Sequence, residues 1–417
     1  MLAHRKVIAS LASLIVAGSG AIVTVAPAEG TSPPSSRADI FQEVWQTVRD
    51  NFFDPHFNGI DWDAAQKRFG NEATKARTDE EFSAVINAML AELRTSHTHF
   101  YTKRDPEYFQ LVALFWSILE PKMKPFIQDS KPSYPGIGIS TYTTEGTLFI
   151  RHIFDGSPAA QAGLHSGDEI LDADRAPFQP IGSFTGKVRK TVELRIRRTA
   201  DAEPVTVPVT PKMLDTTTMF LDAMKASVEI VECDGVKVGY VHIWSYAAES
   251  YQAQLDAELN GRLRGADALV VDLRDGWGGA SPRYLWPFVA PPLTLKRIER
   301  GGQPTTHEEA WTKPVCLLVN EGTRSGKELL TYYFKKVRRG SVVGSRTAGA
   351  LMFGRPIVIS DGSLLFLAVN DLTIDGKRLE GVGVSPDVEV PFLPKFTGGS
   401  DPQKKRAIET AAKASRG

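Results

Sequence analysis

In Val319-Asn320-Glu321-Gly322-Thr323-Arg324-Ser325-Gly326-Lys327-Glu328-Leu329-Leu330, a predicted strand passes through a small polar turn into a predicted helix. The apolar run 314–319 is typical of a buried strand, and 328–336 has the periodicity of an amphipathic helix. Ser325 therefore lies where a strand feeds a helix, and the N–H groups at the helix start can face an incoming carbonyl oxygen. These residues alone leave two roles open for Ser325, a nucleophile or the helix N-cap.

Bulk composition narrows the class of protein. The 417 residues are enough for two or three domains. The chain has 49 basic and 49 acidic side chains, so nothing indicates a nucleic acid or an anionic membrane as partner. Its two cysteines, Cys233 and Cys316, lie far apart and form neither a disulfide framework nor a metal cluster.

The N-terminus has the pattern of a secretory signal. Basic residues at 4–6 precede an apolar run at 7–26, and small residues follow at 26–28. We expect residues 1–28 to be a signal peptide and 29–38 a linker. An uncleaved anchor is the alternative, because the apolar run is nearly long enough to span a bilayer. We therefore expect an exported protein, periplasmic or secreted, without stable membrane insertion after cleavage.

Helical periodicity marks residues 39–127, which we interpret as an N-terminal helical region. This region contains a helix exit at 93–101 that carries His97 and His99. Zinc ligation is one possibility for such a pair. In an extended segment, however, the two side chains point to opposite faces, and no third ligand is placed nearby. A capping or solvent-exposed histidine is the ordinary alternative.

From Tyr134 the chain changes to short strands and glycine turns, which predicts a β domain over residues 134–212. Gly136-Ile137-Gly138-Ile139 resembles the carboxylate-binding loop of a PDZ domain, and 157–170 resembles its helix and following strand. That resemblance implies binding of an extended peptide by strand addition. The turn-rich stretch 172–191 stands where the groove-lining helix of a PDZ domain lies, so a PDZ-like fold without a peptide role remains the alternative.

An α/β alternation follows, in which 236–243 and 268–273 read as buried strands and 250–264 as an amphipathic helix. This spacing predicts a mainly parallel sheet covered by helices over residues 213–395, with a C-terminal tail at 396–417. Functional groups in such sheets gather beyond the strand ends. His242, inside the first of these strands, is expected to be a half-buried neutral histidine.

Three glycines occupy 276–279 at the end of the second strand, where backbone can approach a ligand closely. The segment Asp272-Leu273-Arg274-Asp275-Gly276-Trp277-Gly278-Gly279, taken together with the Ser325 segment, resembles the C-terminal processing (tail-specific) peptidases. The resemblance continues at 96–98, which is similar to the histidine-bearing helix exit of the tricorn-like members, and at 344–349 and 375–387. It implies an α/β fold with a crotonase/ClpP-like peptidase core, an N-terminal helical region and an inserted PDZ-like β domain.

Residue by residue, the resemblance implies that Ser325 is the nucleophile. The oxyanion hole would be the N–H of Gly326 with that of Gly278 or Gly279. In the processing branch a lysine base follows the Gly-x-x-Thr-x-Gly motif, but Ala350 stands there in this chain. His97 can supply the base instead, as in the tricorn-like branch.

A histidine base is normally oriented by a carboxylate. Glu380 stands where the tricorn-like branch carries a glutamate. We therefore expect Glu380 to orient His97, with Asp387 and Glu328 as substitutes. His99 is the competitor for the role of base.

The sequence thus predicts an exported serine endopeptidase that hydrolyses polypeptides through an acyl-enzyme and needs no metal or cofactor. The alternative is a catalytically inactive ligand- or peptide-binding protein on the same scaffold, as in the retinoid-binding relatives of the family. Joint retention of Ser325, His97, the glycines and an acidic partner favours catalysis, because binding requires none of them together.

Overall fold

The computed structural model describes residues 36–127, 131–291, 294–298, 300–303, 305–308 and 310–417. The predicted signal peptide, residues 1–28, lies outside the described residues, as does most of the predicted linker. Within the described ranges, we find no helix that is both long enough and apolar enough to cross a bilayer.

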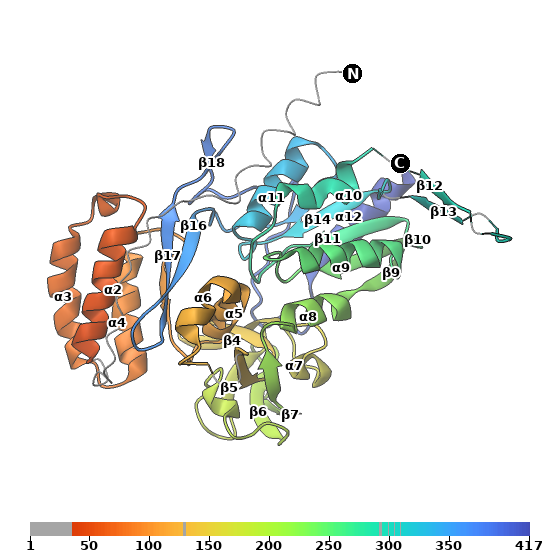
Figure 1. The fold of residues 1–417 in the computed structure, drawn as a ribbon. Helices are drawn as coiled ribbons and strands as arrows, with labels where there is room; N and C mark the ends of the chain where they lie inside the picture. The colour runs from red at the N-terminus through yellow and green to blue at the C-terminus, as the bar shows by residue number, and fades with distance from the viewer. Residues whose placement is uncertain (1–35, 128–130, 292–293, 299, 304, 309) are drawn as a thin grey trace. The chain divides into compact units, whose positions relative to one another are not determined.

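Three helices open the described chain, and each begins at a side chain that caps its free N–H groups. Asp61 and Thr78 accept hydrogen bonds from backbone N–H groups one turn on, and Ser36 exchanges bonds with Asp39. Such caps satisfy donors that a helix start leaves unpaired. The helices are α2 (Arg37–Asn51), α3 (Trp62–Lys75) and α4 (Asp79–Ala91), with a 3₁₀ turn at Phe57–Gly59 between α2 and α3 (Figure 1).

The segment after α4 joins a sheet formed by the C-terminal part of the chain. Strand β1 (His99–Tyr101) pairs antiparallel with β17 (Leu364–Asn370), which also pairs with β16 (Phe353–Val358). His99 lies opposite Phe366 in this register. The histidine-bearing helix exit is thereby carried to residues more than 250 positions away in sequence. Helices α5 (Pro106–Leu114) and α6 (Trp116–Met123) follow β1.

The predicted β domain contains a five-stranded antiparallel sheet with its own apolar core around Ile150, Phe184 and Leu194. Between its third and fourth strands, the described helical structure is a 3₁₀ turn, Gly182–Phe184. The sheet order is β3 (Ile139–Thr144), β4 (Thr147–Ile153), β5 (Glu169–Ala173), β6 (Val192–Arg197), β7 (Val205–Val209). Helix α7 (Pro158–Gln161) follows β4, and β2 (Ser133–Gly136) pairs with β8 (Lys212–Asp215) outside this sheet.

A six-stranded sheet forms the α/β part, and five of its strands run parallel. Every residue of its central strands β11 and β14 is buried, as expected where both faces of a parallel sheet are covered. The order is β20 (Val388–Glu389), β15 (Ser341–Gly344), β14 (Val315–Val319), β11 (Ala268–Asp272), β10 (Val236–His242) and the antiparallel β9 (Glu229–Cys233). Figure 1 labels β14, β11, β10 and β9 of this sheet.

The remaining elements connect these strands. The helices are α8 (Met219–Ser227), α9 (Glu249–Asn260), the 3₁₀ turn Pro282–Leu285, α10 (Trp286–Val289) and α11 (Gly326–Lys336). Two small antiparallel pairs are β12 (Thr294–Arg297) with β13 (Thr305–Glu308) and β18 (Thr373–Ile374) with β19 (Lys377–Arg378).

The segment that the sequence set apart as a tail holds helix α12 (Pro402–Arg416), which packs on the six-stranded sheet. Ala407, Ile408 and Ala411 enter the apolar core there. The helix face is built mainly of alanines among many charged residues, so its apolar content is low, and no packed helix was predicted for residues 396–417. An ion pair of 2.8 Å between Arg274 and Asp401 ties the start of α12 to the end of β11.

Candidate active site

Ser325 adopts an uncommon backbone conformation between β14 and α11. Its φ of 55° and ψ of −130° are expected to cost about 1–3 kcal/mol for a residue with a side chain. An ordinary N-cap residue has a β-region backbone with negative φ, so this conformation differs from a plain cap. The Ser325 N–H holds it by donating to Ala350 O at 2.8 Å and to Glu328 Oε2 at 3.3 Å. Strained residues of this kind concentrate at functional sites.

The glycine loop after β11 packs directly on Ser325. A Cβ added to Gly278 would lie 2.5 Å from the Ser325 Cβ and 3.0 Å from the Gly326 nitrogen, so no larger residue fits. Gly279 has a φ of 92°, which also favours glycine. Within the described part of the chain, the N–H groups of Gly278, Gly279 and Gly326 have no hydrogen-bond acceptor. Free donors at the N-terminus of α11 suit a developing negative charge.

His97 lies at the exit of α4, with a φ of 56° and 7% of its surface exposed. Its ring contacts Phe366 and lies against Gly354, where an added Cβ would be 2.8 Å from Cδ2. Its Nδ1 is 2.8 Å from the hydroxyl of Ser96, and this hydroxyl is 3.0 Å from Glu380 Oε2. The structure therefore brings His97 and Glu380 together through a third side chain.

These contacts determine where the imidazole proton lies. A carboxylate only accepts, so the Ser96 hydroxyl gives its proton to Glu380 and accepts from Nδ1–H of His97. Nε2 is then left with a lone pair. Burial lowers the pKa of His97 to about 3, and the Arg324 guanidinium adds to this effect. The imidazole is therefore neutral at neutral pH.

A two-residue segment joins the two halves of the site. Ala350 accepts from the N–H of Ser325, and the N–H of Leu351 donates to Glu380 Oε2 at 2.7 Å. Glu380 also accepts from the N–H of Ser96 at 2.8 Å. The residues that the structure describes contain no direct hydrogen bond between His97 and Ser325.

The two carboxylates considered in place of Glu380, and the competing base His99, form no hydrogen bond with His97 in the described residues. The buried carboxylate of Glu328 accepts from the Thr347 hydroxyl and from the N–H groups of Gly349 and Ala350, so it holds the loop after β15. Desolvation raises its pKa. Asp387 accepts from the Val342 N–H at 2.9 Å and pairs with Lys335 at 2.6 Å, and exposed His99 packs on Tyr101.

No role for Ser96 or Asp275 was predicted from the sequence. Ser96 stood next to His97 and inside the matched Ser-His-Thr motif, which was the available signal. Lys327 is fully buried, and its Nζ donates to Asp275 O at 2.9 Å. Burial lowers the pKa of Lys327 to about 7, against the opposing effect of nearby carboxylates. Asp275 immediately precedes the glycine loop, so Lys327 anchors that loop to α11.

The loop predicted to resemble a carboxylate-binding site lies between β2 and β3. Gly136 ends β2, and Ile139 begins β3, an edge strand of the five-stranded sheet. The carbonyls of Ile137 and Gly138 accept from the N–H groups of Ala159 and Phe154. The loop is thereby fixed against the α7 turn.

Comparison with protein-family models finds two matches. Residues 237–390 match peptidase family S41, and residues 33–91 match the tricorn protease C1 domain. The first match includes strands β11, β14, β15 and β20, the glycine loop, Ser325 and Glu380.

Curated relatives extend the match over most of the chain. Two tricorn protease homologues of Streptomyces coelicolor are 27% and 25% identical over 403 residues, covering 91% and 92% of this chain but 32% and 36% of the relatives. The chain thus spans about a third of their length. The carboxyl-terminal-processing protease of Synechocystis is 25% identical, covering 88% of this chain and 85% of that protein.

Solved structures support the mixed α/β fold. The tricorn protease aligns with a TM-score of 0.54 and 18% identity, covering 92% of this chain and 37% of that one. The photosystem II D1 C-terminal processing protease aligns with a TM-score of 0.51 and 20% identity, covering 90% and 99%.

Proposed function

We propose that this chain, which carries a peptidase family S41 region at residues 237–390, is a serine endopeptidase that cleaves polypeptides through an acyl-enzyme. Its relatives are named as proteases, which supports catalysis rather than binding alone. The observation that carries the proposal is the hydrogen-bonded series Glu380, Ser96, His97, which holds the imidazole with its Nε2 lone pair free.

In the proposed reaction, Ser325 Oγ attacks the substrate carbonyl while His97 Nε2 takes the hydroxyl proton. The N–H of Gly326, with that of Gly278 or Gly279, stabilises the oxyanion. The intermediate collapses as His97 gives the proton to the leaving amine. Water then attacks the acyl-Ser325 ester, with His97 again as base. The peptide acid is released, and the Ser325 hydroxyl is regenerated.

Glu380 acts on the base through Ser96 in this scheme. Once His97 is protonated on both nitrogens, Nδ1–H still donates to the Ser96 hydroxyl, whose proton remains on the side of Glu380. The negative carboxylate stabilises the imidazolium across this hydroxyl. Substrate binding must also bring Ser325 and His97 into hydrogen-bond contact, since catalytic hydrogen bonds commonly tighten only in the substrate complex.

The proposal has two further parts. The five-stranded domain would act as a PDZ-like module, with the edge of β3 open to an extended peptide, as the Gly136–Ile139 motif suggests. The 3₁₀ turn at 182–184 in place of a longer helix leaves one side of that groove reduced.

Export of the protein would rest on the basic and apolar pattern of residues 1–28.

Hydrolysis of a denatured protein tests the proposed activity. Reduced, carboxymethylated casein is incubated with the wild type and with Ser325→Ala, and new peptides are counted by mass spectrometry. We expect internal cleavages by the wild type only. If both proteins leave the casein intact while remaining folded, the binding alternative replaces the catalytic one.

A further inference from the structure

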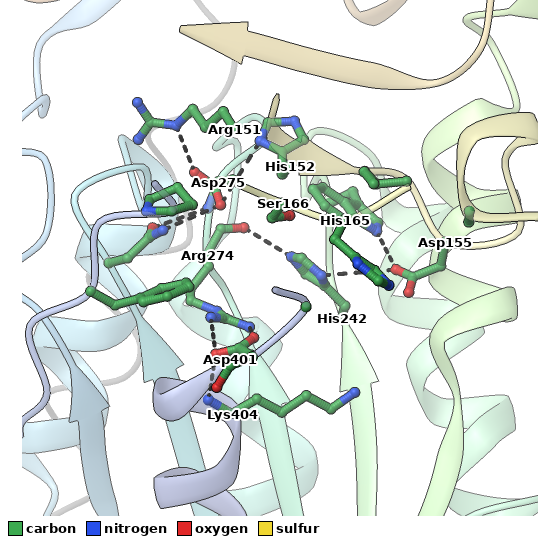
Figure 2. A pocket seen from close by; sticks show the side chains of 18 of the residues that line it. Arg151, His152, Asp155, His165, Ser166, His242, Arg274, Asp275, Asp401 and Lys404 are labelled. Carbon is green, nitrogen blue, oxygen red and sulfur yellow. Dashed lines mark hydrogen bonds and ion pairs between the residues drawn. The ribbon is translucent and has the colours of Figure 1, made fainter. Parts of the chain in front are cut away.

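A polar cavity of about 320 Å³ lies apart from Ser325 and His97, between the β domain and the six-stranded sheet. Figure 2 shows 18 of the side chains that line it. His242 ends β10, and Arg274 and Asn320 follow β11 and β14. These positions are the carboxyl ends of neighbouring parallel strands, where ligands of α/β sheets commonly bind.

The cations that line this cavity already have carboxylate partners. The pairs are Arg151 with Asp275 at 3.2 Å, Arg274 with Asp401 at 2.8 Å and Lys404 with Glu229 at 2.7 Å. Asp155 differs from the other lining carboxylates. It accepts from the Trp244 indole N–H at 2.9 Å, and no lysine or arginine pairs with it in the described chain. Asp155 is thus a lining carboxylate without a lysine or arginine partner in the described chain, and the basic group that faces it is the His242 imidazole.

His242 adds a ring nitrogen without a hydrogen-bond partner in the described residues, Nδ1, beside Asp155. Its Nε2 is 3.0 Å from Arg274 O, and since a carbonyl only accepts, Nε2 carries the proton. In the neutral imidazole Nδ1 then has a lone pair, and it faces Asp155 Oδ2 across 3.9 Å, which is too long for a hydrogen bond (Figure 2). The ring is only 7% exposed and stacks on Trp244 at 3.7 Å, so its orientation is fixed.

Nδ1 of His152, which also lines the cavity, is buried without a hydrogen-bond partner in the described residues and lies 3.9 Å from Asp275 Oδ2. A group with several N–H donors and a positive charge would satisfy Asp155 and His242 together. Metal ions suit the structure less well, because the described residues contain no group of three His, Cys, Asp or Glu side chains arranged as ligands.

We propose that this cavity is an exosite that binds the ammonium or guanidinium group of a basic side chain in the polypeptide substrate. That the bound side chain belongs to a substrate rests on the proposed peptidase function. The binding of a basic side chain in this cavity does not depend on that function. Asp155 supplies the charge, and His242 Nδ1 supplies a directed acceptor. The exosite would select substrates with a lysine or arginine at a distance from the cleaved bond.

Calorimetric titration of the Ser325→Ala protein tests binding without cleavage. The probes are two blocked pentapeptides with alanines around a central lysine or a central norleucine, which lacks the charge. We expect the lysine peptide to bind at least about tenfold more tightly than the norleucine peptide. Charge-assisted hydrogen bonds from the ammonium group to Asp155 are strong enough to produce a difference of this size. Adding Asp155→Asn should remove the preference, whereas Asp174→Asn, whose carboxylate pairs with Lys187 elsewhere on the β domain, should keep it.

The variant His242→Gln provides a second test if Asp155→Asn unfolds, because glutamine retains a donor for Arg274 O and lacks the ring acceptor. Loss of the lysine preference supports the exosite. Equal binding of the two peptides, or an undiminished preference in Asp155→Asn and His242→Gln, overturns it. Tight binding of ZnCl₂ that depends on His242, without a lysine preference, also overturns it. Since Ser325→Ala is used, failure here leaves the peptidase proposal intact, and absence of casein hydrolysis leaves the exosite intact.

Discussion

Ser96 Oγ lies 2.8 Å from Nδ1 of His97 and stands between that imidazole and the carboxylate of Glu380. Glu380 thus contacts the proposed base only through the Ser96 hydroxyl, and this hydroxyl fixes which nitrogen of the neutral His97 imidazole carries the proton. Because Leu351 also donates to Glu380, the same carboxylate fixes the loop that accepts from the N–H of Ser325.

Substitution of Ser96 by alanine should lower kcat on the order of 10–100-fold with little change in KM, because the imidazolium loses its link to Glu380. Ser96→Thr retains the hydroxyl and should recover most of the rate. Steady-state kinetics on a fluorogenic peptide check both variants. A Ser96→Ala enzyme with the wild-type kcat would remove Ser96 from the account.

Gly278→Ala should reduce kcat by about 10²-fold or more, since the added methyl would meet Ser325 and the Gly326 nitrogen and displace the oxyanion donors. Gly265→Ala is the matched control, because a Cβ there meets nothing within 4 Å. Both variants are compared by kinetics and thermal unfolding. Normal turnover by a folded Gly278→Ala protein would show that this loop does not form the oxyanion hole.

The depressed pKa of His97 predicts the pH dependence of activity. Its pKa of about 3 lies below the ordinary 6.5, so the folded protein keeps a neutral, proton-accepting imidazole as pH falls through this interval. The acid limb of kcat/KM should therefore lie below about pH 5. The unfolded state binds more protons between these values, so stability should fall as pH drops from about 6.5 toward 3. A kcat/KM midpoint between pH 6 and 7 would contradict this assignment.

Lys327→Met should flatten the pH dependence of stability at alkaline pH. Burial lowers the pKa of Lys327 in the folded protein to about 7, below the ordinary value for lysine. Between these two pKa values the unfolded state binds more protons than the folded state, so lowering the pH favours unfolding. The wild type should lose up to about 3 kcal/mol of unfolding free energy from pH 9.5 to 7 through this group. Urea unfolding at both pH values measures the loss, and an identical loss in Lys327→Met would exclude the lysine as its source.

Local pattern was informative near Ser325. Burial on both faces makes parallel strands continuous apolar runs, and the run predicted at 314–319 is β14, 315–319. Helix periodicity at 328–336 predicted most of α11, which spans 326–336. The resemblance supplied His97 and Glu380. Ser96 could not be assigned a role from pattern, because a hydroxyl becomes a bridge only when Glu380, 284 residues away, is folded against it.

The packing of α12 and the proximity of Asp155 to His242 could not be predicted from the sequence either. An alanine-rich helix face carries little hydrophobic signal, yet small side chains let the helix approach the sheet closely. Asp155 and His242 come from different parts of the fold, and their shared cavity exists only in three dimensions.

Labelling with a fluorophosphonate probe tests the central claim, that His97 activates Ser325. Intact-protein and peptide mass spectrometry locate and quantify the adduct in the wild type, Ser325→Ala, His97→Ala and His99→Ala. The account predicts one adduct on Ser325 in the wild type and in His99→Ala, and none in the other two. Labelling of Ser325 at the wild-type rate in a folded His97→Ala protein would contradict it.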